Sequence, residues 1–392
     1  MNAQAQRKVK LKVLDKGTEQ PVIAATVVYA DNEALQNLQG SVTNVDGLAE
    51  LKIPSKKTYY YKISYVGFVP ATGKIEATET EKTVYLEEGS VVCGCVSALF
   101  AHGMKILGNG ILNGCVWHPK EENGGGRPMI RLVFCNDVKI QGITMVDGGS
   151  WHMVPGVCRN VEIDDVNIMS RVCTGDGIDI VGCEDLTLRD SFIRASDDCV
   201  CIKAASYPDP AANRNVKNIL VEHCVLWNAE PGNAVEIGYE VRCDEISDIT
   251  FRDLDIVHCQ YEGNQSGGVL TIHNADRAYI HNIVYEDIRV EDAQEKFIDI
   301  KVLDSKYSLD RSRGRVEDIF FRNIEILNGN FPVSIIRGFE MHTEMSRPQN
   351  IHFDNVVVLG EHINSPSDLH MVVELSNDIW FNGKVHVKRN PF

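Results

Sequence analysis

The segment that decides the fold, residues 174–203, reads TGDGIDIVGCEDLTLRDSFIRASDDCVCIK. It contains two short strand patterns, at 178–181 and 200–203, and each follows an acidic turn. Asp176 precedes Asp197 by 21 residues, which is about one circuit in a chain of repeating coils. Neighbouring strands of a sheet lie roughly 4.8 Å apart. We therefore expect Asp176, Asp197 and Asp198 to meet on adjacent strands.

The same strand pattern recurs along most of the chain. Nine three-residue strand cores align at steps of 23 to 36 residues. They begin at Met104, Val138, Val161, Leu186, Ile219, Ile249, Ile283, Ile319 and Ile351. A repeat of this length, built from short strands and lacking long helical periodicity, indicates a solenoid whose coils bury apolar side chains by stacking. We predict an all-β fold, a right-handed parallel β-helix.

A second register can be followed one sheet over. Its inward pairs are Ile178/Ile180, Val200/Ile202, Val235/Ile237, Leu270/Ile272 and Ile298/Ile300. Side chains alternate along a strand, so the residues between and after these pairs point outward. One outer column is Asp179, Cys201, Glu236, Thr271 and Asp299, and the next is Val181, Lys203, Gly238, His273 and Lys301. We expect the two outer columns to form a cleft wall rich in hydrogen-bonding groups.

The first part of the chain has a different sequence pattern, without the coil repeat. Strand patterns at 9–13, 25–29, 49–53 and 59–65 are β-branched or alternating, and 44–47 is a turn signal. This part resembles the carboxypeptidase-regulatory-like β-sandwich of secreted Bacteroidetes proteins. The matching segments are Pro21 together with 24–27, then 43–47, and then 63–68. We predict a β-sandwich domain at 1–88, either a docking module or a spacer, and a β-helix domain at 89–392. Fold alone does not give function, which favours the spacer.

The composition and charge of the chain limit the classes of partner that it is expected to bind. The net charge of −16 argues against nucleic acid and anionic membranes. No apolar run reaches the roughly 18 residues of a membrane span. Residues 1–6 lack the apolar region of a signal peptide, so we expect a chain that is either intracellular or already trimmed. The domain makeup favours trimming, and hence a secreted or periplasmic bacterial protein. The sequence leaves the oligomeric state open.

The twelve cysteines are placed as packing residues rather than as bridges or ligands. Cys135, Cys158 and Cys183 each come shortly before a strand core, at equivalent places in successive coils. The chain has no Cys-x-x-Cys pair, and its histidines are scattered. We therefore expect mostly free, buried thiols, no structural zinc and no cofactor.

From about residue 84 onward the chain resembles the polygalacturonase family, glycoside hydrolase family 28. Members carry Asn-Thr-Asp-Gly-x-Asp, an Asp-Asp pair, Gly-His-Gly and Arg-Ile-Lys. Here the first motif is 174–179 and the second, at 197–198, is intact. The third is 232–234, with Asn233 in place of histidine, and the fourth is 271–273, Thr-Ile-His, which lacks both cationic residues. The resemblance implies a glycoside hydrolase acting on a carbohydrate.

The resemblance also implies roles for the three aspartates. Asp197 would be the general acid, and Asp176 and Asp198 would activate water in an inverting hydrolysis. That reaction needs carboxylates roughly 6.5–9.5 Å apart, and crowded carboxylates raise one another's pKa, as a proton donor requires. An Asp-Asp pair alone is weak evidence, because 164–165 has the same pattern and is expected to be solvated.

The substrate-binding candidates are Trp151, His152, Asp179, Lys203, Asn233, Glu236 and His273. Asn233 either binds a sugar hydroxyl or stacks inside a turn. Lys203 and Glu236 are either sugar ligands or a charge-satisfying pair on adjacent coils. For His273 a place at the edge of the core is favoured over a ligand role. Trp151 is either a stacking platform for a sugar ring or a packing residue.

The lost cationic motif makes a neutral sugar the expected substrate in preference to galacturonate. Lys203, His273 and Lys301 could still supply positive charge, so an acidic sugar stays open. One rival is a polysaccharide lyase, which needs a uronate and a cationic base, often with calcium. The other is a non-catalytic glycan-binding β-helix. The insertion at 204–216 is a candidate for closing one end of the cleft, as exo action would need.

Overall fold

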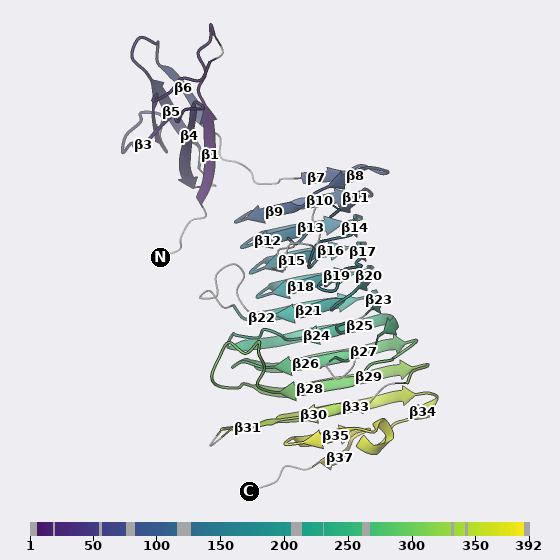
Figure 1. Cartoon of the computed structure of the whole chain (residues 1–392). Helices are drawn as coiled ribbons and strands as arrows, with labels where there is room; N and C mark the ends of the chain where they lie inside the picture. Colours follow the sequence, from purple (N-terminus) through teal and green to yellow (C-terminus); the bar gives the residue numbers. More distant parts are fainter. Residues whose placement is uncertain are drawn as a thin grey trace. The chain divides into compact units, whose positions relative to one another are not determined.

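The computed structural model describes residues 6–18, 20–54, 57–75, 83–115, 127–204, 214–229, 231–260, 267–330, 333–341 and 344–387. The chain divides into two compact units, Met1–Lys82 and Thr83–Phe392 (Figure 1). The division comes slightly before the expected one at 88, because β7 (Thr83–Leu86) pairs in parallel with β10 (Lys105–Gly108). Strand β7 therefore belongs to the second unit.

The first unit contains two small antiparallel sheets. Strand β1 (Gln6–Lys12) pairs with β4 (Leu48–Pro54). The other sheet has the order β3 (Gln39–Val42), β2 (Thr26–Ala30), β5 (Tyr59–Ser64), β6 (Ala71–Ile75). Val27, Leu51 and Tyr59, which come from both sheets, are buried in one core. Membership of the carboxypeptidase-regulatory-like family remains a prediction.

The second unit is a solenoid made almost entirely of strands. Its larger sheet consists of β7, β8 (Val91–Cys93), β10, β11 (Ile111–Asn113), β13 (Asn136–Gln141), β14 (Thr144–Val146), β16 (Arg159–Asp164), β17 (Asn167–Met169), β19 (Glu184–Arg189), β20 (Phe192–Ala195), β22 (Val216–Glu222), β23 (Val225–Asn228), β25 (Glu245–Cys259), β27 (Tyr279–Val290), β29 (Arg315–Ile326), β33 (Pro348–Val358), β34 (Glu361–His362), β36 (Asn377–Phe381) and β37 (Lys384–Val387).

A second sheet runs beside it, with one strand from each coil. It consists of β9 (Val96–Leu99), β12 (Ile130–Val133), β15 (Met153–Gly156), β18 (Ile178–Val181), β21 (Val200–Lys203), β24 (Val235–Ile237), β26 (Leu270–Asn274), β28 (Ile298–Val302), β30 (Ile335–Arg337) and β35 (Val372–Glu374). The remaining described elements are the hairpin of β31 (Phe339–Met341) with β32 (Glu344–Ser346) and the short 3₁₀ helix η1 (Pro366–Leu369).

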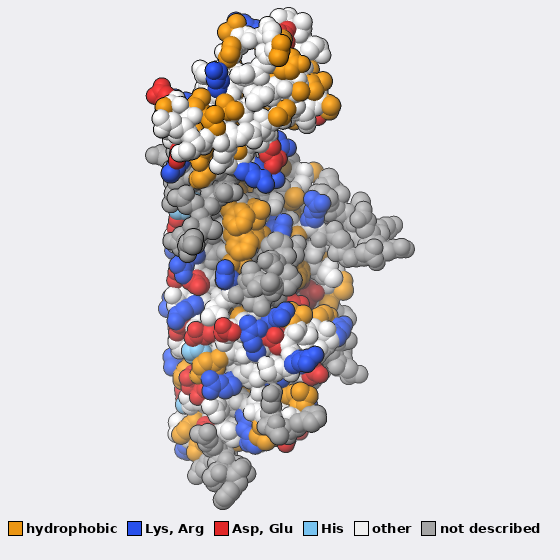
Figure 2. Space-filling view, turned by 90° about the vertical axis from the view of Figure 1, so that its left-hand side faces the viewer, with side chains coloured by type: hydrophobic (Ala, Val, Ile, Leu, Met, Phe, Trp, Pro, Cys, Tyr) orange, Lys and Arg blue, Asp and Glu red, His pale blue; other side chains and the backbone are white. Residues whose placement is uncertain are grey.

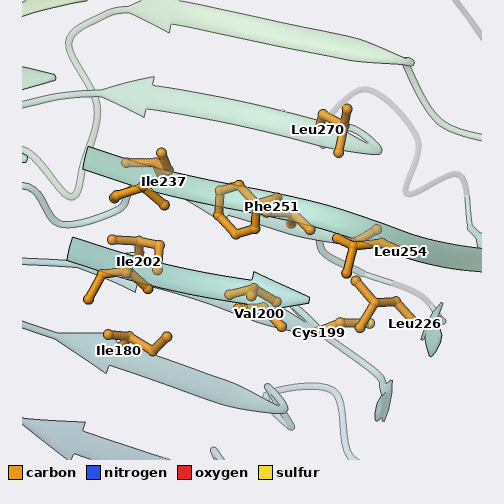
Figure 3. Close-up of a cluster of buried hydrophobic side chains, with 14 of the residues drawn as sticks. Ile180, Cys199, Val200, Ile202, Leu226, Ile237, Phe251, Leu254 and Leu270 are labelled. Atoms are coloured by element: carbon orange, nitrogen blue, oxygen red, sulfur yellow. The ribbon is translucent and has the colours of Figure 1, made fainter. Parts of the chain in front are cut away.

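The coils stack in the register that the repeat predicts. Val138 pairs with Val161, and the same parallel column continues through Leu186, Ile219, Ile249, Ile283, Ile319 and Ile351. In the second sheet, Ile180 lies opposite Ile202, which lies opposite Ile237. Figure 3 shows these three isoleucines above one another on successive coils. The predicted solenoid of parallel strands is confirmed.

Aromatic rings continue the core toward the C-terminus. Phe251, Tyr285, Phe321, Phe353 and Phe381 form a buried stack, and successive ring centroids lie 4.8 to 5.0 Å apart. Each ring comes from the corresponding position of one coil. The stack gives every coil in this part of the solenoid a large apolar contact with the next.

Asn and Asp recur at positions of positive φ for a backbone reason. Asp185 and Asn218 adopt positive φ values of 57° and 56° on successive coils, a conformation that Asn and Asp tolerate better than most residues. Asn218 Nδ2 also donates to Asp185 Oδ1 at 2.9 Å. At 164–165 the expectation of solvation is only half right, since Asp165 is exposed at a bend but Asp164 is buried beside Arg189, 3.4 Å away.

The thiols give a first testable prediction. All twelve cysteines are free and eight are buried, including Cys135, Cys158 and Cys183 at equivalent coil positions. Titration of the denatured, unreduced protein with a thiol reagent is therefore expected to find most of them. Cys93 and Cys115 are exposed with sulfur atoms 3.4 Å apart, so a loss confined to that pair agrees with the structure. Recovery of only a few thiols would contradict it.

The surface mixes charges of both signs. Figure 2 shows acidic and basic side chains interspersed over the face that it views, with hydrophobic patches between them. The net charge of −16 therefore does not make this face uniformly anionic. Within the described ranges, no helix has the length and apolar character needed to cross a membrane.

Candidate active site

Asp176 lies in the turn before β18, where the coils approach closely. The Gly177 N–H donates to the Asp198 carbonyl oxygen on the next coil at 2.8 Å. A Cβ at Gly177 would lie 2.4 Å from the Cys199 carbonyl oxygen, which is too close for any side chain. Glycine at this position thus allows the Asp176 turn to stack directly on the turn of Asp197 and Asp198.

Asp197 and Asp198 lie in the turn before β21 and are held from the following coil. Gly232 has a φ of 109°, and a Cβ there would lie 2.5 Å from the carbonyl carbon of Asp197. Asn228 Nδ2 donates to the Asp197 carbonyl oxygen at 2.8 Å. The backbone of the acidic pair is therefore enclosed by its neighbours.

The structure brings the three aspartates together. One carboxylate oxygen from each of Asp176, Asp197 and Asp198 lies within 4.8 Å of the others. These nearest oxygens are closer than the roughly 6.5–9.5 Å separation expected for an inverting pair. Asp198, Cys201 and Glu236 form a second set with ligand atoms within 4.8 Å. Either set has the spacing to hold a cation, and both belong to the same acidic cluster.

The electrostatics of Asp176 suit a proton donor. Burial raises its pKa well above the usual range for aspartate, and the adjacent Asp179 charge adds to this shift, while Lys203 opposes it. Asp176 Oδ1 is buried and, within the described part of the chain, accepts no hydrogen bond. A carboxyl group in this setting retains its proton to a higher pH than an exposed one.

Lys203 is enclosed by acidic and aromatic partners. Its Nζ lies 2.9 Å from Asp179 Oδ1 and 3.5 Å from Asp176 Oδ2. The same atom lies 4.1 Å from the ring centroid of Trp151, a cation–π geometry. Lys203 therefore satisfies charge as expected, but its carboxylate partners are Asp179 and Asp176, and Glu236 is not its ion-pair partner in the structure.

Asn233 occupies the place of the histidine in the resembled motif and bonds inside the protein. Its Nδ2 donates to Asp198 Oδ1 at 2.7 Å and to Glu236 Oε2 at 3.0 Å, and its backbone N–H donates to the same Asp198 oxygen at 2.9 Å. Its Oδ1 accepts from Gly268 N and Thr271 Oγ1. Asn233 thus orients Asp198, a role that neither expected alternative included.

His273 is fully buried between two carboxylates. Its Nδ1 lies 2.8 Å from Glu236 Oε1, and its Nε2 lies 3.3 Å from Asp299 Oδ2, in poorer alignment for a hydrogen bond. Tyr239 stacks on the ring with centroids 5.1 Å apart. Burial, reinforced by the nearby Asp198 charge, raises the pKa of Glu236 well above its usual range. His273 contacts protein groups, as the favoured core-edge interpretation expects.

His152 holds the Asp176 turn. Its Nδ1 lies 3.1 Å from the Asp176 carbonyl oxygen, and its Nε2 accepts from Gly148 N at 3.2 Å. Burial lowers the pKa of His152 to about 4. The ring is therefore neutral at neutral pH, and it does not line the cavity described next.

A cavity of about 460 Å³ opens above the three aspartates. The described residues lining it are Trp151, Thr174, Asp176, Asp197, Asp198, Lys203, Pro231, Gly232, Asn233, Glu236, Tyr239, Glu240, Lys306 and Tyr307. Sequence reasoning did not identify Tyr239, Lys306 or Tyr307. Lys306 and Tyr307 follow β28 in an irregular segment, so no strand pattern marks them. Of the insertion at 204–216, residues 205–213 lie outside the described ranges.

The expected cleft wall needs a correction. The outer columns pair as predicted, for example Cys201 with Glu236, but most of these side chains are buried, and Asp179, Thr271 and Asp299 are fully so. Among the described members of both columns, only Lys203 and Glu236 line the cavity. The reason is that residues of the adjoining turns, Trp151 and Tyr239 among them, cover this face.

Asp179 gives a prediction about pH. Burial raises its pKa to about 6, against about 3.9 in an unfolded chain. The folded protein therefore binds the Asp179 proton more tightly than the unfolded chain does. The stabilisation that this gives is fully present below the unfolded pKa and is lost as pH rises through the folded pKa of about 6. Between about pH 3 and 7.5, the free energy of unfolding of the wild type, relative to Asp179→Asn, is expected to fall by on the order of 3 kcal/mol.

Denaturant unfolding at several pH values measures this difference. Asp185 in β19 provides a matched control, since Asp185→Asn removes a carboxylate that is exposed. A difference between the wild type and Asp179→Asn that does not change with pH would contradict the assignment.

The sequence is similar to those of known polygalacturonases. The exopolygalacturonase of Zea mays is 24% identical over 313 residues, covering 74% of this chain and 72% of that protein. The polygalacturonase of Cryptomeria japonica is 23% identical over 239 residues, covering 57% of this chain and 44% of that protein. The match thus spans less than half the length of the Cryptomeria protein.

Two solved structures share the fold. The family 28 exopolygalacturonase of Yersinia enterocolitica superimposes with a TM-score of 0.53 at 10% identity, over 86% of each chain. The polygalacturonase of Erwinia carotovora gives 0.50 at 14% identity, over 70% of this chain and 79% of that one. The model of a sequence family, Glycosyl hydrolases family 28, matches residues 47–361. Since this match covers most of the chain, the protein belongs to glycosyl hydrolase family 28.

Proposed function

We propose that the protein hydrolyses a glycosidic bond in a poly- or oligosaccharide by an Asp-based acid/base mechanism with inversion. The observation that carries the proposal is the cluster of Asp176, Asp197 and Asp198 on a sugar-sized cavity. A hydrolase of this kind needs a proton donor and an ionised group that activates water. The crowded aspartates offer both.

Within this proposal Asp197 protonates the leaving oxygen, and Asp176 and Asp198 orient the water. Asp198 is suited to the ionised role, because two N–H groups of Asn233 donate to one of its oxygens. The raised pKa of Asp176 makes it the alternative proton donor. Variants tested on substrates with different leaving groups separate the two assignments.

The proposed substrate is a neutral or mixed glycan. At the position of the cationic motif, Thr271 and His273 are fully buried and bonded to protein groups. Of the described residues lining the cavity, Lys203 and Lys306 are the cationic ones, and Lys203 is already paired with Asp179. A uronate carboxylate would thus lack the clamp that the resembled motif supplies. Each absent charge-assisted hydrogen bond forfeits roughly 1.5–3 kcal/mol.

A glycan panel tests the substrate. Polygalacturonate, rhamnogalacturonan, arabinogalactan and dextran are incubated with the protein, and the release of reducing ends and the product sizes are followed. Faster turnover of a neutral or mixed glycan than of polygalacturonate is expected. Turnover of polygalacturonate alone would contradict the substrate proposal while leaving the hydrolase proposal in place.

The stereochemistry is tested on the same reaction. Proton NMR of the first product, recorded before mutarotation, is expected to show the opposite anomeric configuration to the substrate. The main alternative is a double displacement, in which one carboxylate acts as a nucleophile and configuration is retained. Retention would therefore replace the proposed division of roles by a double displacement.

The rival functions give distinct results in the panel. A lyase would release an unsaturated product that absorbs in the ultraviolet, and only from a uronate-containing glycan. A non-catalytic binder would retain a glycan without any product. The acidic character of the cavity opposes the lyase, because elimination from a uronate needs a cationic base.

A further inference from the structure

A chain of buried polar contacts leads away from Asp198 and passes under the cavity. Asn233 joins Asp198 to Glu236, Glu236 contacts His273, and His273 contacts Asp299. Its members lie on four successive coils, around β21, β24, β26 and β28. Of these residues, His273 and Asp299 are fully buried and do not line the cavity.

The end of this series of contacts at Asp299 is surrounded by positive charge. Asp299 lies 2.8 Å from Lys301 Nζ and 3.6 Å from Lys296 Nζ, and Lys296 also pairs with Glu295 at 3.0 Å. Burial alone would raise the pKa of Asp299, but the interactions with His273, Lys301 and Lys296 outweigh it and hold the pKa below its usual range. Asp299 is thus a fixed anion against which the His273 ring is oriented.

His273 lies between Asp299 and Glu236, and so connects the buried ion pairs of Asp299 to the residues beside Asp198. Glu236 Oε2 accepts from Asn233 Nδ2 at 3.0 Å and has a longer contact with Cys201 Sγ at 4.0 Å, whereas Oε1 is held by His273 Nδ1 at 2.8 Å. Without His273, Glu236 would keep a raised pKa but lose the contact that sets the direction of its carboxyl group. Asn233 Nδ2 donates to both Glu236 and Asp198, so a displaced Glu236 would alter the hydrogen bond that Asn233 gives to Asp198.

We propose that His273 is a positioning residue for the proposed hydrolysis, holding Glu236 against Asn233 so that Asn233 keeps Asp198 in place. The inference rests on the proposed function, because it assigns Asp198 a part in the reaction. This role of His273 would explain how Asp197 and Asp198 are fixed in a protein that lacks the Gly-His-Gly histidine and the Arg-Ile-Lys cations of the resembled family. His273 acts from beneath the cavity and does not touch the substrate.

A double-mutant cycle tests this. His273→Ala, Glu236→Ala and the double variant are assayed on the glycan of the panel that the wild type hydrolyses fastest. His273→Ala is expected to lower kcat by roughly 10- to 10²-fold, the scale of a small misplacement of a reacting group, with little change in KM. In the Glu236→Ala background the same substitution is expected to cause no further loss, since its target is gone. Losses that multiply, or a wild-type kcat in His273→Ala, would overturn the proposal.

Two further variants separate positioning from folding. His273→Asn places an amide N–H at the position of the His273 Nδ1 that faces Glu236, so it is expected to retain much of kcat. The amide of His273→Gln corresponds instead to Nε2, on the Asp299 side, so this variant is expected to lose kcat. Equal kcat values in these two variants would overturn the proposal even if His273→Ala does not fold. The neighbouring Asn274 is a matched control, being fully buried on the same strand and bonded to the Ala278 carbonyl oxygen at 2.7 Å. Asn274→Ala is expected to leave kcat unchanged.

Asp198→Asn, measured in the same assay, distinguishes the two levels of failure. If Asp198→Asn is fully active, the proposed function itself is wrong at this site. If Asp198→Asn is inactive while His273→Ala is not impaired, only the positioning role of His273 fails.

Discussion

Replacing Asp176, Asp197 or Asp198 by asparagine is expected to lower kcat by at least roughly 10²-fold, the scale of acid–base catalysis. Each carboxyl group is needed in the transition state, either to deliver a proton or to orient water. Binding of substrate should change little, because asparagine preserves the shape and most of the hydrogen-bonding capacity of aspartate. Steady-state kinetics on the preferred glycan measure kcat and KM separately.

The leaving group tells the three variants apart. A substrate with an activated leaving group needs little proton donation, so it should partly restore Asp197→Asn and leave Asp176→Asn slow. The reverse pattern would make Asp176 the proton donor, in line with its raised pKa. Asp165→Asn is the matched control, since Asp165 belongs to another Asp-Asp pair and is exposed at a bend. Rates like the wild type in all three variants would place the active site elsewhere.

Phe321→Ala is expected to cause the largest loss of stability, about 3–5 kcal/mol in the free energy of unfolding. Phe321 lies in the middle of the aromatic stack, with centroids 4.9 Å from Tyr285 and 4.8 Å from Phe353. The truncation removes both contacts and leaves a cavity that rigid neighbouring coils cannot fill. Denaturant unfolding followed by circular dichroism measures the change.

The adjacent phenylalanine provides the comparison. Phe320 points to the other face of β29, is only partly buried, and stacks on His352 with centroids 5.1 Å apart. Phe320→Ala should therefore cost clearly less than Phe321→Ala. Equal losses would mean that burial in the stack is not the source of the stability.

The sequence alone was sufficient for the repeat and for the meeting of the aspartates. The strand cores from Val138 to Ile351 form one parallel column because stacked coils place equivalent residues in register, and apolar residues at alternate positions permit only one face inward. The same stacking explains why Asp176 and Asp197, 21 residues apart, lie on neighbouring coils. Both features follow from local periodicity.

The partners of the outward side chains were decided only by the tertiary structure. The strand period says that Asp179, Glu236 and His273 leave the core, but not what lies above them. In the structure Lys203 turns toward Asp179, and His273 lies between Glu236 and Asp299 beneath Tyr239. These contacts depend on the paths of the turns between strands. Turn paths are set by how neighbouring coils pack against each other, and no short-range pattern in the sequence encodes them.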